Sequence, residues 1–203
     1  MGDQISVLGA HFKTAFPYSH DWPTYVEALN YPAGPDVIVS GQIGATKLAS
    51  ELNWVASHCS ANIPNIVLAG HSQGAYVITQ TLGGPIAISA KARSAIKAVA
   101  LFGDPSYTPG MPYKVWNATG IGLLPSSAAQ FNAIASTYKY FGYEPGNPAT
   151  SPGWHYKVRE WCFTGDAVCQ SGLSSSAWTI HSAYTAIMDQ VADWMDGRLT
   201  DTT

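Results

Sequence analysis

The sequence predicts an α/β fold, a three-layer sandwich in which helices cover both faces of a central, mainly parallel sheet. Two observations lead to this class. Short apolar segments of strand length recur along the chain, and longer segments with helical spacing of apolar residues lie between them. Strands that alternate with helices form parallel sheets, and parallel sheets need helices on both faces.

The expected strands are apolar runs, the last with alternating polar side chains. They cover residues 5–10, 66–69, 98–102 and 156–161. Reactive groups of such sheets collect at the edge where parallel strands end. We therefore expect chemistry in the loops that follow these strands.

The expected helices cover residues 40–59, 75–82, 127–137 and 180–194. Ser40 is expected to cap the first helix, in which Leu48, Leu52 and Val55 share one face. The last helix has the clearest pattern, because its apolar residues recur at steps of three and four. These residues are Ile180, Tyr184, Ile187, Val191 and Trp194.

The composition excludes several classes of protein. Of 203 residues, 46% are hydrophobic and 11% are charged, which excludes a disordered chain. Ten basic and 13 acidic residues give a net charge of -3 without a basic stripe, so no nucleic-acid partner is expected. No run is apolar enough for a transmembrane segment. We expect a monomer with one domain over residues 1–203, carrying a loop-rich aromatic insert at about 106–157.

Low charge and the cysteines indicate a secreted, extracellular protein, although no signal peptide is visible in the chain. Cys162 and Cys169 flank a Gly-Asp turn, and we expect a disulfide between them that stabilises the fold by ~2 kcal/mol. The alternative is two reduced, buried thiols. Cys59 is then left over as a buried thiol or one without its partner.

Residues 70–74, Gly-His-Ser-Gln-Gly, lie between an expected strand and an expected helix. This context distinguishes the nucleophile turn of an α/β-hydrolase from a chance match. Ser72 is expected on a sharp turn, and side chains at Gly70 and Gly74 are expected to clash with neighbouring elements. The following helix directs its first N–H groups at negative charge that develops beside Ser72. The alternative is a Gly-Ser turn that caps a helix.

A serine hydroxyl needs a base, and this fold predicts the order serine, acid, histidine. Asp166 follows the 156–161 strand, and His181 begins the last helix. We expect Asp166 to hold one ring nitrogen of His181 while the other faces Ser72. The alternatives are a turn aspartate and a solvent-facing histidine.

Other candidates for these roles are weaker. Asp104 ends the 98–102 strand, where some hydrolases carry the acid, but Asp-Pro is more often a turn former. His155 precedes its strand instead of following it, and His71 is expected to be a packing residue. The remaining histidines lack metal-ligand spacing, so we expect neither a metal nor a cofactor. They are His11, His20 and His58.

The chain resembles the cutinase and acetylxylan esterase family, small serine esterases with a lidless α/β-hydrolase fold. The resemblance rests on residues 5–10, 30–33, 70–74 and 162–169, the last followed by His181. It implies a triad of Ser72, Asp166 and His181, with the Gln73 N–H as one oxyanion donor. Lys13 matches the second oxyanion position, where the family usually has Ser or Thr.

Two further departures from the family matter. The cysteine that normally pairs with the equivalent of Cys59 is absent, and the insert after residue 106 is long and aromatic. Lysin B, a phage esterase that cuts mycolic acid esters of the mycobacterial cell wall, also has a long insert, so phage-encoded cell-wall lysis is an alternative.

The sequence therefore predicts a serine esterase that hydrolyses polyester or lipid-like acyl esters. Trp154, Tyr138, Tyr140, Phe141 and Tyr143 are expected to form an apolar wall or to pack the insert down. The alternatives are deacetylation of acylated polysaccharide, cleavage of mycolyl esters, and a catalytically inactive module that binds a glycan or lipid.

Overall fold

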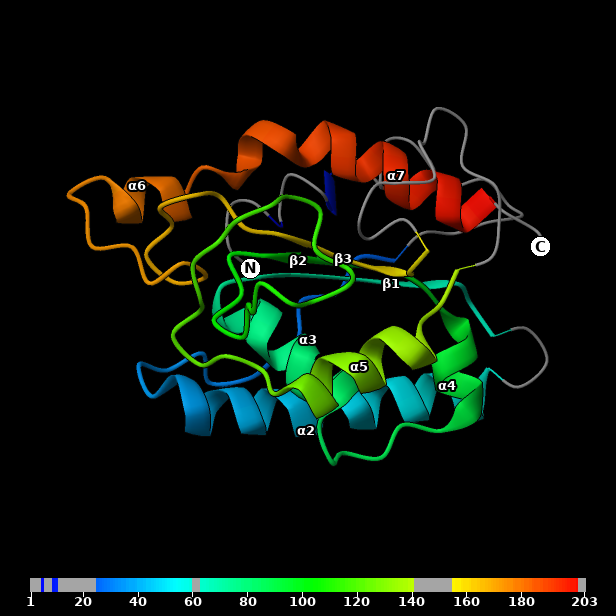
Figure 1. The fold of residues 1–203 in the computed structure, drawn as a ribbon. Coiled ribbons are helices and arrows are strands. Elements are labelled where there is room, and N and C mark those ends of the chain that lie inside the picture. Colours follow the sequence, from blue (N-terminus) through cyan, green and yellow to red (C-terminus); the bar gives the residue numbers. More distant parts are fainter. Residues whose placement is uncertain (1–4, 6–8, 11–24, 60–62, 141–154, 201–203) are drawn as a thin grey trace.

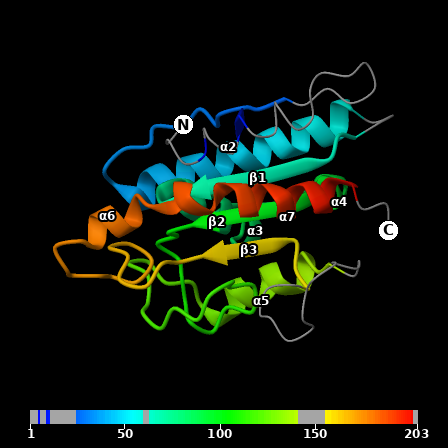
Figure 2. The same ribbon diagram turned by 90° about the horizontal axis from the view of Figure 1, so that it is seen from above.

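The computed structural model describes residues 5, 9–10, 25–59, 63–140 and 155–200. Within them, three parallel strands form one sheet in the order β1-β2-β3. They are β1 (Ile66–His71), β2 (Ile96–Phe102) and β3 (Val158–Trp161). All three point toward the end of the molecule at which α6 lies (Figure 2), so their carboxyl ends form one edge there.

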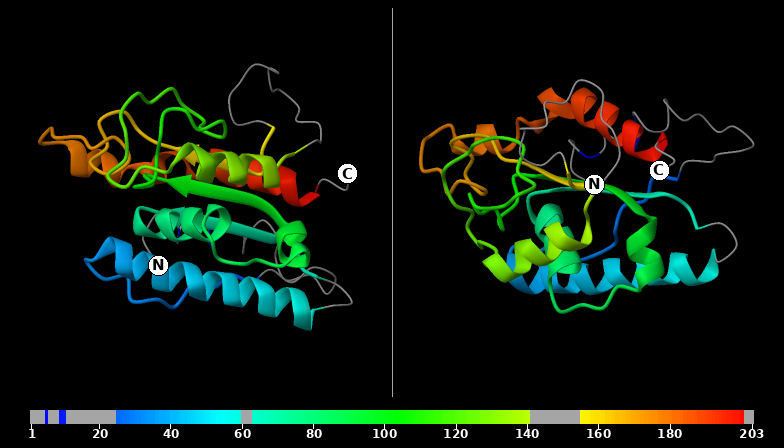
Figure 3. Two further views of the ribbon diagram at one scale, coloured as in Figure 1. Left: turned by 60° about the horizontal axis from the view of Figure 1, so that its bottom comes forward. Right: turned by 45° about the vertical axis from the view of Figure 1, so that its right-hand side comes forward.

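Helices cover both faces of this sheet, which confirms the predicted class (Figure 1). On one face lie α2 (Val37–His58), α3 (Gln73–Gly83), α4 (Ala90–Ala95) and α5 (Ala128–Thr137). On the other lie η1 (Tyr184–Ile187) and α7 (Met188–Thr200), with α6 (Ala177–His181) at the carboxyl edge. The right-hand view of Figure 3 shows the same three layers.

The two faces of the sheet bury separate apolar clusters. Val99 and Leu101 of β2 pack with α2 and α3 on one side. Ala100 and Phe102, which alternate with them, pack with Trp161 and α7 on the other. Parallel strands covered on both faces are apolar throughout, which explains the apolar run of β2. The side chains of β1 are half-buried and pack against both clusters.

The first and last predicted elements are wrong in part. Of the strand expected over 5–10, the described residues Ile5, Gly9 and Ala10 are helical. The single helix expected over 180–194 is divided into α6, η1 and α7. The expected spacing persists because both parts bury the same side: Tyr184 and Val191 are fully buried.

The structure also differs from the expected one at the first long helix, at α4 and at β3. The first long helix begins at Val37, because Asp36 accepts a hydrogen bond from Val39 N (3.0 Å) and takes the capping role expected of Ser40. Helix α4 was not expected. Strand β3 does not alternate between core and solvent, since Arg159 and Glu160 are as buried as their neighbours.

The aromatic insert packs against the body through some of its tyrosines. Tyr107, Tyr113 and Tyr138 are at most 1% exposed, so Tyr138 is part of the core and not of a surface wall. The ring of Tyr140 lies against the Arg198 guanidinium. Phe141, Tyr143 and Trp154 lie outside the described residues. In the described part of the chain, no helix is long and apolar enough to cross a bilayer.

Candidate active site

Ser72 occupies the turn between β1 and α3, as predicted. Its backbone has φ 56° and ψ -122°, a conformation that costs a side-chain-bearing residue about 1–3 kcal/mol. The Ser72 N–H donates to the Phe102 carbonyl (2.9 Å), and the Ser72 carbonyl accepts from Tyr76 N (3.1 Å). The turn is therefore fixed to the end of β2 and to the first turn of α3.

The two flanking glycines differ in the space that the described residues leave around them. A Cβ at Gly70 would lie 2.5 Å from the Gly74 carbonyl oxygen, so no side chain fits there. A Cβ at Gly74 would meet no atom within 4 Å among the described residues, so none of these supplies the clash expected at this position.

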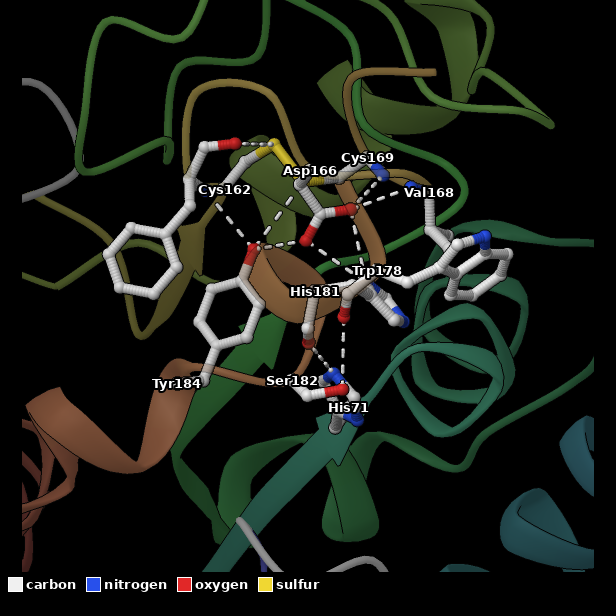
Figure 4. A network of polar contacts seen from close by, with 10 residues as sticks. His71, Cys162, Asp166, Val168, Cys169, Trp178, His181, Ser182 and Tyr184 are labelled. Carbon is white, nitrogen blue, oxygen red and sulfur yellow. Dashed lines mark hydrogen bonds and ion pairs between the residues drawn. A yellow bond between two sulfur atoms is a disulfide. The ribbon is translucent and has the colours of Figure 1, made fainter. Parts of the chain in front are cut away.

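The structure brings Asp166 and His181 together at the carboxyl edge (Figure 4). His181 Nδ1 lies 2.9 Å from Asp166 Oδ2 and 3.0 Å from Oδ1, and both side chains are buried. A carboxylate can only accept, so Nδ1 carries the proton and Nε2 is left as the basic nitrogen. This is the orientation that a general base requires.

The loop around Asp166 holds its carboxylate by main-chain donors. Oδ1 accepts from Val168 N (2.6 Å) and Cys169 N (2.9 Å). Burial alone raises the pKa of Asp166, but the hydrogen bond and charge of His181, with these two N–H groups, outweigh burial and hold the pKa below its ordinary value. Asp166 is consequently ionised at neutral pH.

The disulfide between Cys162 and Cys169 is present and closes this loop. Cys169 supplies one of the N–H donors to Asp166, so the cross-link restrains a residue that holds the carboxylate. Cys59, in contrast, is a free thiol.

Residues next to the Ser72 turn contact the imidazole of His181. His71, the residue before Ser72, has its ring 4.6 Å from the His181 ring. Gly103 follows Phe102, whose carbonyl accepts the Ser72 N–H. It lies so close to the imidazole that a Cβ at this position would be 2.8 Å from His181 Cε1. No hydrogen bond joins the Ser72 hydroxyl to His181 within the described residues.

Of the two expected oxyanion donors, only Gln73 lies among the described residues. Gln73 begins α3, and its side chain is fixed: Nε2 donates to the Gly34 carbonyl (2.8 Å) and Oε1 accepts from Ser40 Oγ (3.3 Å). Lys13 lies outside the described residues.

The competing acid and base are engaged elsewhere. Asp104 is fully buried, accepts from Thr79 Oγ1 (2.5 Å) and Ser106 N (2.7 Å), and has a pKa that burial raises to about 6 despite those bonds. His155 is exposed in the turn before β3, which begins at Val158, and so precedes the strand end opposite to the carboxyl edge. Among the described residues no three His, Cys, Asp or Glu side chains form a metal-binding group.

Sequence reasoning missed Tyr184 and Gly103 as parts of this site. Tyr184 donates its hydroxyl hydrogen to Asp166 Oδ2 (2.8 Å), and its place in the helical pattern identified it only as a core residue. Gly103 adopts φ 56° after β2. A glycine that directly follows a buried strand at the reactive edge was the available signal.

A serine on a strained strand-to-helix turn, at the carboxyl edge of a parallel sheet, defines the fold as that of an α/β-hydrolase. Within that class, the family model described as Cutinase matches residues 5–199. The chain belongs to the cutinase family.

Curated relatives with a related sequence come from bacteria and fungi. Carboxylesterase Culp1 of Mycobacterium tuberculosis is 38% identical over 157 residues, which are 76% of this chain and 62% of the relative. Cutinase 11 of Verticillium dahliae is 27% identical over 82% of this chain, and acetylxylan esterase 2 of Talaromyces purpureogenus is 28% identical over 74%. The chain spans 54% of the length of Cutinase 11 and 80% of that of the acetylxylan esterase.

Solved structures share the fold. An acetylxylan esterase superposes with a TM-score of 0.71 at 22% identity, with 96% of this chain and 89% of that chain covered. A Trichoderma reesei cutinase superposes with a TM-score of 0.60 at 23% identity, with 96% and 67% covered.

Proposed function

We propose that the chain is a cofactor-independent serine esterase with Ser72 as nucleophile, His181 as base and Asp166 as the group that orients it. The observation that carries this proposal is the buried Asp166–His181 pair, which lies beside the turn that bears Ser72. Membership of the cutinase family supports the same reaction.

Each residue has one chemical task. The Ser72 hydroxyl attacks the ester carbonyl while His181 Nε2 takes its proton, and a tetrahedral intermediate forms. Backbone N–H groups, that of Gln73 first, stabilise the oxyanion, and Lys13 is proposed to supply the second N–H. His181 then returns the proton to the leaving alcohol, and a water molecule activated by the same imidazole releases the acid.

Apolar side chains beside the site favour esters with a long acyl chain, such as lipid or polyester substrates. Leu173 is 99% and Trp178 66% exposed, and the Trp178 ring lies 5.7 Å from the His181 ring. Ile38 and Val39, also exposed, begin the helix that Ser40 ties to Gln73. A short acetyl group needs no such surface.

The experiment combines a variant with a substrate series. Ser72→Ala is expected to lose ester hydrolysis by ~10⁴-fold or more, whereas Ser50→Ala, an exposed serine in α2, keeps it. A serine-directed phosphonate should modify Ser72 in the unaltered protein, as mapped by peptide mass. Full activity of Ser72→Ala would remove the proposal, and binding of esters without turnover would favour an inactive binding module.

The substrate series decides the acyl class. Rates on nitrophenyl esters are expected to be greatest at butyrate or longer chains. A maximum at acetate would instead favour an acetylxylan-type deacetylase, and selective release of mycolic acids a lysin B-like esterase. Secretion and a monomeric state complete the proposal, and size-exclusion chromatography with light scattering tests the latter.

A further inference from the structure

The main-chain carbonyl of His181 has a hydrogen-bond donor that comes from the nucleophile turn. His181 is the last residue of α6, where helical carbonyls lack an intrahelical partner. His71 Nε2 lies 2.8 Å from this oxygen. A carbonyl can only accept, so His71 carries its proton on Nε2 and donates it.

The imidazole of His71 also packs against the side chains around the base. Its ring centroid lies 4.6 Å from that of His181, tilted by 33°, and 5.6 Å from that of Tyr184. The titratable groups that face it are therefore His181, Tyr184 and Asp166. Burial, followed by the proximity of His181, lowers the pKa of His71, so it is neutral at neutral pH.

The segment that carries the base is short and is held by a few tertiary contacts, among them the bonds of His181 to Asp166 and the burial of Ala177. Helix α6 has five residues, its N-cap Ser176 makes no side-chain capping bond, and Trp178 is mostly exposed. Such a short helix is not stable by itself and depends on tertiary contacts. The bond from His71 supplies one at the residue whose position matters for proton transfer.

We propose that His71 is a positioning residue, which ties the turn that bears Ser72 to the segment that bears His181 and so sets the distance between nucleophile and base. This inference rests on the proposed function. In this role His71 takes up no proton from Ser72; it acts through the main chain of His181. It adds a role to a residue for which the sequence predicted only packing.

Two substitutions separate the hydrogen bond from the ring packing. His71→Phe keeps an aromatic ring but removes the donor. His71→Gln removes the ring but can place an amide N–H close to the position of Nε2. A displacement of about 1 Å in such a site can cost 10²-fold in rate.

With a nitrophenyl ester, kcat of His71→Phe is expected to fall roughly 10- to 100-fold while KM stays within about twofold. His71→Gln is expected to keep kcat within about threefold of the unaltered protein. Recovery of kcat by Gln would show that the donated bond, and not the ring, is required. Wild-type kcat in His71→Phe, or equal losses in both variants, would overturn the inference.

Two controls keep the test decisive. If His71→Phe is not recovered folded, as judged by circular dichroism and thermal unfolding, His71→Leu replaces it with the same expectations. Ser72→Ala, measured in parallel, separates the two proposals. If Ser72→Ala is inactive and His71→Phe is fully active, only the role of His71 fails; if Ser72→Ala is active, the proposed function fails.

Discussion

Tyr184 donates its phenolic hydrogen to Asp166 Oδ2 at 2.8 Å. The direction of this bond is set by Phe163, whose N–H donates to the same hydroxyl oxygen at 3.0 Å and leaves the hydrogen free to face the carboxylate. Burial first, and then the Asp166 charge, raise the pKa of Tyr184, so the phenol stays neutral. The acid therefore has a permanent side-chain donor in addition to its main-chain donors.

Replacing Tyr184 with Phe should impair both activity and stability. The change leaves the Phe163 N–H without an acceptor and removes a donor from a charged group, which costs about 1.5–3 kcal/mol. We expect the free energy of unfolding, measured in urea, to fall by that amount. We also expect kcat to fall about tenfold, since Asp166 orients the base. Tyr107→Phe is the matched control, because Tyr107 is an equally buried tyrosine whose hydroxyl donates to the Ala118 carbonyl (2.8 Å). A loss of kcat in Tyr107→Phe as large as that in Tyr184→Phe would contradict a specific role.

Gly103→Ala should displace the base. The new Cβ would lie 2.8 Å from His181 Cε1 and 2.9 Å from Nδ1, on a backbone with φ 56°. We expect kcat/KM to fall about 10²-fold or more because the imidazole must move away from Asp166. Gly165→Ala carries a similar backbone strain at φ 86°, but among the described residues its Cβ would meet only the Ile180 side chain, at 3.3 Å.

Both glycine variants should therefore lose stability, by about 1 kcal/mol or more, and only Gly103→Ala should lose most of its activity. Thermal unfolding and ester hydrolysis measure the two effects. Equal activity in the two variants would show that the space around the imidazole is not limiting.

Glu160 should make the protein less stable as pH rises. Both of its carboxyl oxygens are buried without a hydrogen-bond partner among the described residues. Burial, assisted by the nearby Asp104 carboxyl, raises the pKa of Glu160 well above its ordinary value of 4.5. The folded protein then binds this proton more tightly than the unfolded chain. Its stabilising contribution is complete below the ordinary pKa and is lost as pH rises through the folded pKa.

Glu160→Gln removes this dependence. Each such proton contributes a slope of ~1.4 kcal/mol per pH unit to the unfolding free energy. Asp104, with its pKa of about 6, contributes its slope to both proteins, so the difference between the two curves reports Glu160. The unfolding free energies of the two proteins, measured in urea, should converge at acidic pH. At alkaline pH they should diverge, and the variant should be the more stable protein. Parallel pH curves would refute the assignment.

Removal of the disulfide should affect both the fold and the acid. Cys162→Ala combined with Cys169→Ala loses ~2 kcal/mol by the loop-closure argument. It should also lower kcat by about tenfold, since Cys169 N–H is a donor to Asp166 Oδ1. Cys59→Ala, which removes the free thiol, is the control and should keep kcat. Unchanged kcat in the double variant would show that the loop holds Asp166 without the cross-link.

Local signals were sufficient for part of this architecture. The apolar run that became β2 is continuous because both faces of this strand are buried, and β1 packs half-buried apolar side chains against both clusters. The motif around Ser72 was identified by the strand and helix that flank it. The pairing of Asp166 with His181 followed from their order after Ser72. The disulfide followed from two cysteines that flank a turn.

Other features depend on contacts that sequence spacing does not reveal. Asp36 and Ser40 are both suitable caps; Asp36 accepts the capping bond from Val39 N, whereas Ser40 Oγ is engaged by Gly34 and by Gln73, 33 positions away. The break between α6 and η1 contains neither Gly nor Pro, so helical spacing continued across it. The burial of Glu160 contradicts the alternation of its strand and could not have been inferred from that pattern.

The break after His181 separates the base from the long C-terminal helix. Because α6 is a short unit outside the main layers, it can detach while the sheet and α7 remain folded. On heating, hydrolysis should therefore stop at a lower temperature than that at which the core melts. Amide hydrogens of residues 177–181 should exchange with solvent before those of β2.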